Sequence, residues 1–433
     1  MLREPSGETA KVPSATSPGA KRIRILGPGL ITGASDDDPS GIATYSQVGA
    51  QFGFGVAWVM LFSWPLMAAT QEISARIGRI TGQGLAGNIR AHYSPVLLRV
   101  TVALLVFANV INIGADLGAM ADAIHITVGG PPQVYVALLA IGCAGLEIFS
   151  SYEHYVAILK WLCLSLLAYV AVVLVVGIPW GRVVYNTLVP TFVFDERYIT
   201  GIVAVLGTTI SPYLFFWQSS EEAEDERTDP DAAPLLYAPK DADRELKRIR
   251  FDTYLGMGAS NLIGWFIVLT TAATLHAHGI TEIESSTQAA DALRPIAGEF
   301  AFAVFAIGII GTGLLAVPVL AGSAAYAIGE ALRWPTGLGR LPRDAKAFYA
   351  TIAVATLLGV GINLVEIDPI AALVWSAVVN GIVAVPVMAV MMLMAANEKV
   401  MGPLTIPPGL RIVGWASFAA MAAAVIAMFT TWL

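Results

Sequence analysis

Long apolar stretches alternate with short polar ones along most of the chain. About 20 consecutive, predominantly apolar residues are enough for a helix to cross a bilayer. This pattern predicts eleven membrane-spanning helices, at residues 23–53, 55–82, 96–127, 132–150, 153–180, 198–222, 252–276, 299–330, 347–364, 368–396 and 410–432. We therefore expect an all-α polytopic membrane protein, with residues 23–433 forming a single transmembrane domain in contact with the lipid bilayer.

The composition supports this class. Hydrophobic residues make up 56% of the chain and charged residues only 13%, which is too apolar for a soluble protein of this size. Residues 1–22 are polar and lack the apolar core of a signal peptide, so we expect a disordered cytoplasmic tail. Cys143 and Cys163 lie in apolar runs and indicate neither a disulfide framework nor a thiolate metal site. Neither a nucleic acid nor an obligatory protein partner is expected.

The distribution of Lys and Arg indicates the orientation, because cytoplasmic loops carry an excess of these residues. With the N-terminus inside, the loops after the second, sixth and eighth helices are cytoplasmic, and these are the basic loops. A rival count of ten helices puts one basic loop on the wrong side. We expect a cytoplasmic N-terminus and an extracytoplasmic C-terminus in a bacterial inner membrane. The polar residues 221–251 are expected to form a cytoplasmic linker.

The segment Asp36-Asp37-Asp38-Pro39-Ser40-Gly41 interrupts the first apolar stretch near its middle. Carboxylates at that depth are costly, and they usually face a cavity and serve a function. Pro39 and Gly41 disfavour a continuous helix, so the freed backbone groups need partners from protein, water or an ion. The segment predicts a discontinuous helix whose break binds a cation.

A second interruption, Gly207-Thr208-Thr209-Ile210-Ser211-Pro212-Tyr213, lies five helices later. Pro212 considered alone is also compatible with an ordinary kink. Two interrupted helices at matching positions instead indicate inverted repeats that bind a substrate between them near the membrane midplane. The expected repeats are residues 23–180 and 198–396, with a peripheral helix at 410–432.

These two interruptions resemble motifs of the Nramp divalent-metal transporters. The first helix carries Gly27-Pro28-Gly29, Asp38-Pro39, Ile42-Ala43-Thr44, Gly49-Ala50 and Phe52-Gly53; the sixth carries Gly207 to Pro212, and the third Ala115-Asp116-Leu117. The resemblance extends from Gly27 to about Asn397. It implies a LeuT-like fold of eleven helices, with helices 1 and 6 broken, that transports divalent cations and is not an enzyme.

The chain departs from the usual Nramp pattern at four positions. Gly41 replaces a metal-binding Asn, Ser211 replaces a Met, and Tyr213 replaces a His. Ala119 aligns with a family Glu linked to proton movement. This pattern is similar to that of the divergent Nramp-related magnesium transporters, the NRMT branch.

The replacements predict a site that offers oxygen atoms rather than sulfur or imidazole. Oxygen ligands suit Mg²⁺, which also gives up its water reluctantly. Gly41 removes a direct ligand and leaves space for a partly hydrated ion. The expected metal site comprises Asp38, Gly41, Thr208, Thr209 and Ser211. Its hydroxyls have an alternative role, since Ser and Thr in membrane helices often bond to the preceding turn.

Four further residues are candidates for the ion path or for a second layer around the site. Asp37, like Asp36, either attracts cations or caps a half-helix. Asp116 either lines the path or belongs to a structural polar network. Tyr213 is favoured as a plug with a bonded hydroxyl, and Asn380 lies near the position of a family Gln that reaches the metal.

The sequence therefore predicts a transporter that moves Mg²⁺, and also Mn²⁺, into the cytoplasm by alternating access, with no cofactor besides the transported ion. The five histidines lie at helix ends or in loops, which argues against a midplane proton relay and favours uncoupled transport. Asp116 leaves proton involvement open. The first alternative is a proton-coupled Mn²⁺/Fe²⁺ symporter of ordinary Nramp type. The second, a membrane metal sensor or enzyme without transport, lacks a catalytic motif such as His-Glu-x-x-His.

Overall fold

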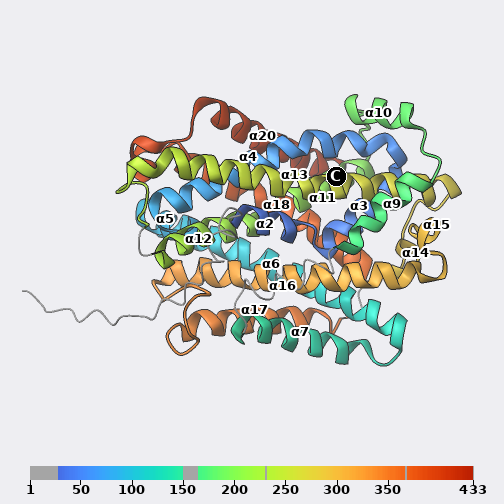
Figure 1. The fold of residues 1–433 in the computed structure, drawn as a ribbon, viewed down its shortest axis with the longest axis horizontal. Coiled ribbons are helices and arrows are strands. Elements are labelled where there is room, and N and C mark those ends of the chain that lie inside the picture. Colours follow the sequence, from blue (N-terminus) through green and yellow to red (C-terminus); the bar gives the residue numbers. More distant parts are fainter. Residues whose placement is uncertain (1–27, 150–163, 230–231, 366–367, 433) are drawn as a thin grey trace, which may run out of the picture.

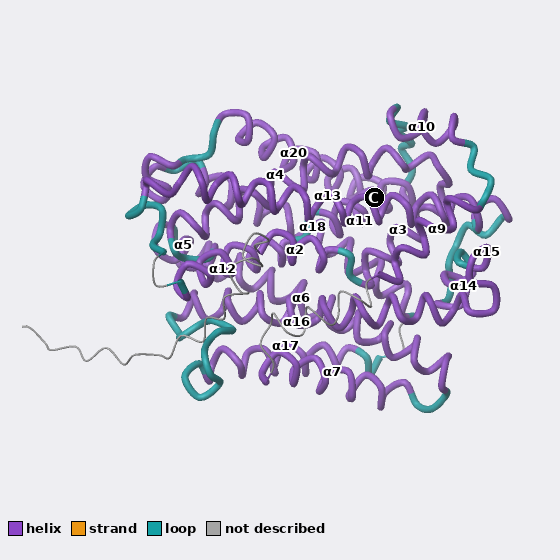
Figure 2. The backbone as a smooth tube through the Cα atoms, viewed as in Figure 1, coloured by secondary structure: helices purple, strands orange, loops and turns teal. Residues whose placement is uncertain are grey.

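The computed structural model describes residues 28–149, 164–229, 232–365 and 368–432. Every regular element in these ranges is a helix, and the long helices run along an elongated bundle (Figures 1 and 2). The predicted all-α class is thus confirmed. The main unbroken helices are α4 (Ala57–Thr81), α6 (Pro95–Val128), α7 (Pro132–Phe149), α9 (Leu167–Val175), α13 (Ala242–Thr274), α16 (Ala301–Leu332), α17 (Lys346–Ile362), α18 (Pro369–Ala395) and α20 (Pro408–Thr431).

Two expected helices are broken in the way the sequence predicts. The first consists of α2 (Pro28–Asp36) and α3 (Pro39–Phe52), and the sixth consists of α11 (Glu196–Thr209) and α12 (Pro212–Thr228). Each second half begins with a proline, a residue that suits the first helical position because its missing N–H has no partner there anyway. Each break leaves two residues without helical structure, Asp37–Asp38 and Ile210–Ser211.

The described helices agree with the predicted eleven spans. Eight are long and apolar enough to cross a membrane, and Leu164–Val175 and α17 are shorter apolar helices. One of the eight, Pro39–Thr81, contains both α3 and α4, because the short 3-10 helix η1 (Gly53–Val56) joins them directly. The expected tail at 1–22 and the first part of the expected fifth helix, 153–163, lie outside the described residues.

The broken helices lie between two groups of long helices. On one side α13 packs against α2, α3 and α4; on the other, α6 packs against α16, α17 and α18. Helices α7 and α17 form an outer layer along one edge of the bundle (Figure 1). The expected peripheral helix at 410–432 corresponds to α20, which packs on α18, α4 and α11.

The expected linker at 221–251 is corrected to a shorter segment. Helix α12 continues to Thr228 and α13 begins at Ala242. Their polar ends remain helical because buried side chains such as Glu222 and Ile249 pack inside the bundle. Pro234 lies between the two helices and Pro239 begins the short 3-10 helix η3 (Pro239–Asp241), whereas Pro230 lies outside the described residues.

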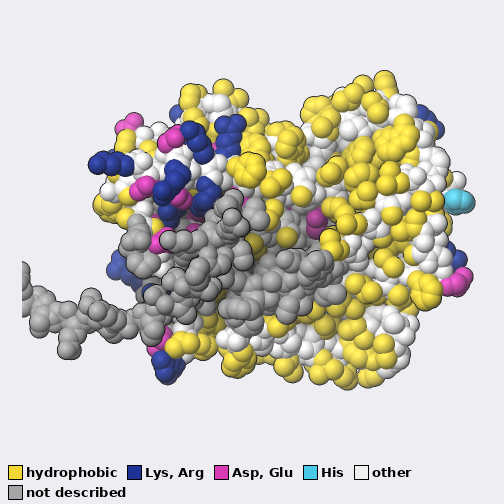
Figure 3. Space-filling model, viewed as in Figure 1, with side chains coloured by type: hydrophobic (Ala, Val, Ile, Leu, Met, Phe, Trp, Pro, Cys, Tyr) yellow, Lys and Arg dark blue, Asp and Glu magenta, His cyan; other side chains and the backbone are white. Residues whose placement is uncertain are grey.

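Lys and Arg gather at one end of the bundle, which we call the basic end (Figure 3, dark blue). It is formed by the C-terminal ends of α4, α12 and α16 and the N-terminal ends of α6, α13 and α17. The remaining elements are short connections: α5 (Leu85–His92), α10 (Trp180–Leu188), α14 (Ser286–Asp291), α15 (Arg294–Ala297), α19 (Glu398–Met401) and the 3-10 helices η2 (Leu164–Leu166), η4 (His276–His278), η5 (Gly298–Phe300) and η6 (Gly402–Leu404).

Candidate cation site at the two broken helices

Asp38 lies in the gap between α2 and α3 and is only 2% exposed. Its carboxylate caps α3, because Oδ1 accepts hydrogen bonds from the Gly41 N–H and the Ser40 hydroxyl, each at 2.7 Å. The partial positive charge at a helix N-terminus also stabilises a carboxylate there. The alternative in which Asp36 or Asp37 caps this half-helix is therefore wrong. Capping leaves Asp38 Oδ2 directed toward the other broken helix.

The two breaks contact each other, as the sequence predicts. The Tyr213 hydroxyl, on α12, lies 3.3 Å from Asp38 Oδ2 and 3.1 Å from the Ser35 carbonyl oxygen of α2. Across the same contact, a Cβ atom at Gly41 would lie 3.1 Å from Thr208 Oγ1. Gly41 thus lets the Thr208 hydroxyl approach α3, where it lies beside the Tyr45 side chain.

The hydroxyls of Thr209 and Ser211, the other two expected at this break, turn back onto α11. Thr209 Oγ1 donates to the carbonyls of Val205 and Leu206, and Ser211 Oγ lies 2.8 Å from the carbonyl oxygens of Gly207 and Thr208. This is the alternative role that the sequence leaves open for them. Each oxygen keeps lone pairs after donating its proton, so neither bond prevents the hydroxyl from accepting a cation.

Asp36 and Asp37 face α13. The Ser260 hydroxyl lies 2.6 Å from Asp36 Oδ2 and 3.0 Å from Asp37 Oδ1, and one proton cannot satisfy both. Asp36 Oδ1 has no partner among the described residues. In the described structure, the hydrogen-bond donors to these three consecutive buried carboxylates are therefore hydroxyls and a backbone N–H group, with no charged side chain among them.

Asp116 and Asn380 differ in what they contact. Asp116 is fully buried on α6, both of its oxygens lack a partner in the described part of the chain, and α6 packs against α3, which follows Asp38. Asn380 instead exchanges two hydrogen bonds with Asn112 of α6, at 2.8 and 3.1 Å. Asp116 is thus positioned beside the site, whereas Asn380 joins α18 to α6.

The site concentrates negative charge without a basic partner. No ion pair involves Asp36, Asp37, Asp38 or Asp116 in the described ranges. Buried carboxylates of this kind are costly unless a cation or proton compensates them. The described residues also contain no group of three or more His, Cys, Asp or Glu side chains arranged to hold one metal ion directly.

A cavity of about 540 Å³ opens at the end opposite the basic end. Val48 of α3 and Gly201 of α11 line it, together with acidic side chains including Glu196, Glu282 and Asp368. Val48 is ten residues beyond Asp38, about 15 Å along the helix at 1.5 Å per residue. Asp38 is not among the lining residues, so this cavity approaches the site but does not include it.

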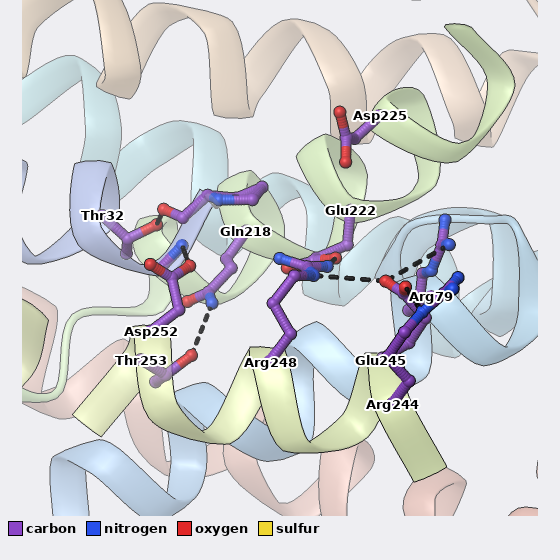
Figure 4. A network of polar contacts seen from close by, with 12 residues as sticks. Thr32, Arg79, Gln218, Glu222, Asp225, Arg244, Glu245, Arg248, Asp252 and Thr253 are labelled. Carbon is purple, nitrogen blue, oxygen red and sulfur yellow. Dashed lines mark hydrogen bonds and ion pairs between the residues drawn. The ribbon is translucent and has the colours of Figure 1, made fainter. Parts of the chain in front are cut away.

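Toward the basic end, α2 packs tightly on α13. The Gly29 N–H donates to Asp252 Oδ2 at 2.7 Å, and Gln218 of α12 donates to Thr253 at 2.9 Å (Figure 4). One turn further, a Cβ atom at Gly33 would lie 2.3 Å from the backbone carbon of Gly256. This contact holds the backbones of α2 and α13 together at a distance that only glycine allows.

Ion pairs continue these contacts with α13 toward the surface of the basic end (Figure 4). Arg248 of α13 pairs with the fully buried Glu222 of α12 at 2.5 Å and with Glu245 at 3.2 Å. Glu245 also pairs with Arg79 of α4 at 3.4 Å. The network links α4, α12 and α13 around the polar segment that the sequence assigned to a linker.

Two residues of the site were missed from the sequence. Tyr45 is fully buried on α3, and its ring carbon Cε2 lies 3.4 Å from a Cβ atom placed at Gly41. Its position four residues after Gly41, on the same helical face, was the available signal. Ser260 belongs to no recognisable motif, and only the packing of α13 against α2 reveals its role.

The fold and the site together define a polytopic helical membrane protein with two broken helices that meet at buried carboxylates. Residues 29–431 match the family described as natural resistance-associated macrophage protein-like, so the chain belongs to the Nramp family. The divalent metal cation transporter MntH of Verminephrobacter eiseniae is 26% identical over 392 residues, covering 88% of this chain and 83% of that protein. MntH of Klebsiella pneumoniae strain MGH 78578 is 25% identical over 422 residues, covering 94% of each.

Solved structures confirm the expected fold. A histidine-to-alanine mutant of the Eremococcus coleocola manganese transporter has a TM-score of 0.73 at 15% identity, covering 96% of this chain and 88% of that one. The LeuT-like fold extends to MhsT in complex with L-phenylalanine, with a TM-score of 0.52 at 12% identity and coverage of 91% and 98%. The predicted LeuT-like architecture with broken helices 1 and 6 is thus confirmed.

Proposed function

We propose that this chain transports divalent metal cations across a membrane by alternating access, with Mg²⁺ as its substrate and Mn²⁺ as a second ion that it accepts. The observation that carries the proposal is the Asp38 carboxylate, which lies in one helix break, contacts Tyr213 of the other broken helix and has no basic partner in the described ranges, while Thr208 approaches nearby Gly41. Its relatives named MntH support transport of a divalent metal.

The donors at the breaks favour a hard cation. The polar side chains that meet there, on Asp38, Thr208, Ser211 and Tyr213, offer only oxygen. Thioether and imidazole groups would favour transition metals, whereas Mg²⁺ takes oxygen ligands and retains several waters. In our proposal Asp38 supplies the charge, Thr208 a hydroxyl, and water the rest of the shell.

The direction of transport follows from the charge distribution. Cytoplasmic loops are enriched in Lys and Arg, so we place the basic end in the cytoplasm and the acidic cavity outside. Membrane potential then favours entry of a divalent cation. We propose that no proton is coupled to this movement: His92, His125, His276 and His278 all lie at helix ends.

A second candidate is a proton-coupled transporter of Mn²⁺ or Fe²⁺. Two observations favour it: the unpartnered Asp116 carboxylate beside the site, and the structural similarity to a manganese transporter. Competition separates the two functions. Excess Mg²⁺ should slow Mn²⁺ uptake if Mg²⁺ is a substrate, and unaffected Mn²⁺ uptake would instead support the second candidate.

The deciding experiment is ion uptake into liposomes that contain the full chain, with Mg²⁺, Mn²⁺ and Ca²⁺ compared and a pH indicator inside. We expect Mg²⁺ and Mn²⁺ uptake without metal-dependent acidification. Asp38→Ala should abolish both, because it removes the charge at the break. Asp243→Asn is the matched control, since Asp243 is exposed at the basic end and its ion pair among the described residues is with exposed Lys247. Uptake that persists in Asp38→Ala would remove Asp38 from the site.

A further inference from the structure

A second group of carboxylates lies between the helix breaks and the basic end, with Glu147 buried and Glu221 and Glu224 half-buried. Glu147 of α7 is 5% exposed, and its Oε1 has no partner among the described residues. It points at α16, where a Cβ atom on Gly322 would lie only 2.9 Å from Glu147 Oε1. Glycine at this position therefore leaves the space that the carboxylate occupies.

Two more carboxylates, both on α12, contact α16 one helical turn beyond Gly322. Tyr326 follows Gly322 by four residues and so occupies the same helical face. Its hydroxyl is 3.0 Å from Glu221 Oε1 and also contacts Glu224 Oε2. Glu224 accepts further hydrogen bonds from the Leu338 and Gly339 N–H groups. In the part of the chain that the structure covers, neither glutamate pairs with Lys or Arg, and the charged groups that act on Glu221 are other carboxylates.

This group is continuous with the first site. Cys143 of α7, one turn before Glu147, is buried, and α7 packs against α6, which carries Asp116. Helix α6 in turn packs against α3, which follows Asp38. Glu221 is ten residues after Ser211 on α12, about 15 Å toward the basic end. The carboxylates thus form a series from Asp38 through Asp116 and Glu147 to the Glu221–Glu224 pair.

We propose that Glu147, Glu221 and Glu224 form a second, weak binding site for a hydrated divalent cation on its path from Asp38 to the basic end. The proposal rests on the transport function proposed above. The described residues do not arrange three acidic side chains around one ion directly, so the cation keeps its water and is held through it, as Mg²⁺ commonly is. A weak, charged site keeps cations near the exit without trapping them.

Binding and transport test the proposal separately. Mn²⁺ binding to the purified full chain is followed by electron paramagnetic resonance, which distinguishes free from bound Mn²⁺. We expect Asp38→Ala to lose the tighter site but retain one weak site, and Asp38→Ala combined with Glu147→Gln and Glu221→Gln to lose both. In liposomes, Glu147→Gln/Glu221→Gln should lower Mg²⁺ uptake about tenfold, the low end of what charged clefts add to local cation concentration. The affinity of the Asp38 site should stay unchanged.

The outcomes are distinguishable from failure of the proposed function. If the wild-type chain moves no divalent cation, transport itself is refuted; if it does and the double glutamine variant equals the wild type, the second site is refuted. Retention of weak Mn²⁺ binding in the triple variant would also refute it. Glutamine keeps the shape of Glu147 and removes an unpaired charge, so these variants should fold. Should Glu147→Gln fail to do so, Glu221→Gln/Glu224→Gln tests the same path. Asp243→Asn again controls for lost surface charge.

Discussion

The packing of α2 on α13 gives a sharp test of how the basic end opens. Gly33 is the point of closest approach, because a Cβ atom there would lie 2.3 Å from the Gly256 backbone carbon and 2.5 Å from its oxygen. Gly33→Ala therefore cannot be accommodated by rotating a neighbouring side chain. We expect the substitution to push α2 away from α13 and to favour a state open at the basic end.

The size of the effect follows from the geometry. Ordinary contacts of a Cβ atom begin at about 3.4 Å, so α2 must withdraw by about 1.1 Å from its present 2.3 Å separation. Overpacking of a well-packed interior costs about 1–3 kcal/mol. If that cost falls on the closed state alone, the closed-to-open equilibrium shifts by about 5- to 150-fold. Uptake should fall, because alternating access requires both states.

Thiol accessibility measures the shift directly. Thr253 lies beneath α2, fully buried against Gly29. In a background with Cys143 and Cys163 replaced by alanine, Thr253→Cys reports exposure of this surface to a membrane-impermeant maleimide applied at the basic end. We expect labelling to be faster in Gly33→Ala than with Gly33 present.

Gly361→Ala is the matched control, because it adds the same methyl group to a helix where nothing lies within 4 Å. It should leave labelling and uptake unchanged. Equal labelling of Thr253→Cys with and without the Gly33→Ala substitution would show that the glycine contact does not hold the basic end closed, and the reasoning would be wrong.

Two further predictions concern the ion and the closing network. Ser211→Met should shift competition toward Mn²⁺ or Cd²⁺ over Mg²⁺, because it adds a soft sulfur ligand; unchanged selectivity would show that Ser211 does not face the ion. Arg248→Met should destabilise the protein by about 3–5 kcal/mol, since it leaves buried Glu222 without its partner. Thermal unfolding in detergent measures this loss, and Glu222→Met/Arg248→Met should recover most of it. No difference between the single and double variants would contradict the assigned pairing.

Much of the fold follows from the sequence, because its signals are local. A bilayer requires long apolar helices whose backbone bonds are satisfied internally, so eleven spans can be counted from the apolar stretches. Pro39 and Pro212 mark the two breaks, since each proline starts a new half-helix. The linker bounds could not be predicted in the same way, because the polar ends of α12 and α13 stay helical through ion pairs between helices.

The candidate site, likewise, could be predicted from the sequence only in part. The sequence by itself determined that a carboxylate, Asp38, stands at one break and hydroxyls stand at another, since residue type and helix-breaking propensity are properties of short segments. Only the tertiary structure decided where these oxygens lie: Asp38 Oδ1 caps α3, Ser211 turns back on α11, and Thr208 lies beside Gly41 and Tyr45. It also placed Glu147 of α7 and the Glu221–Glu224 pair of α12 against neighbouring turns of α16. Such contacts depend on how helices pack, and glycines far apart in the sequence set that packing.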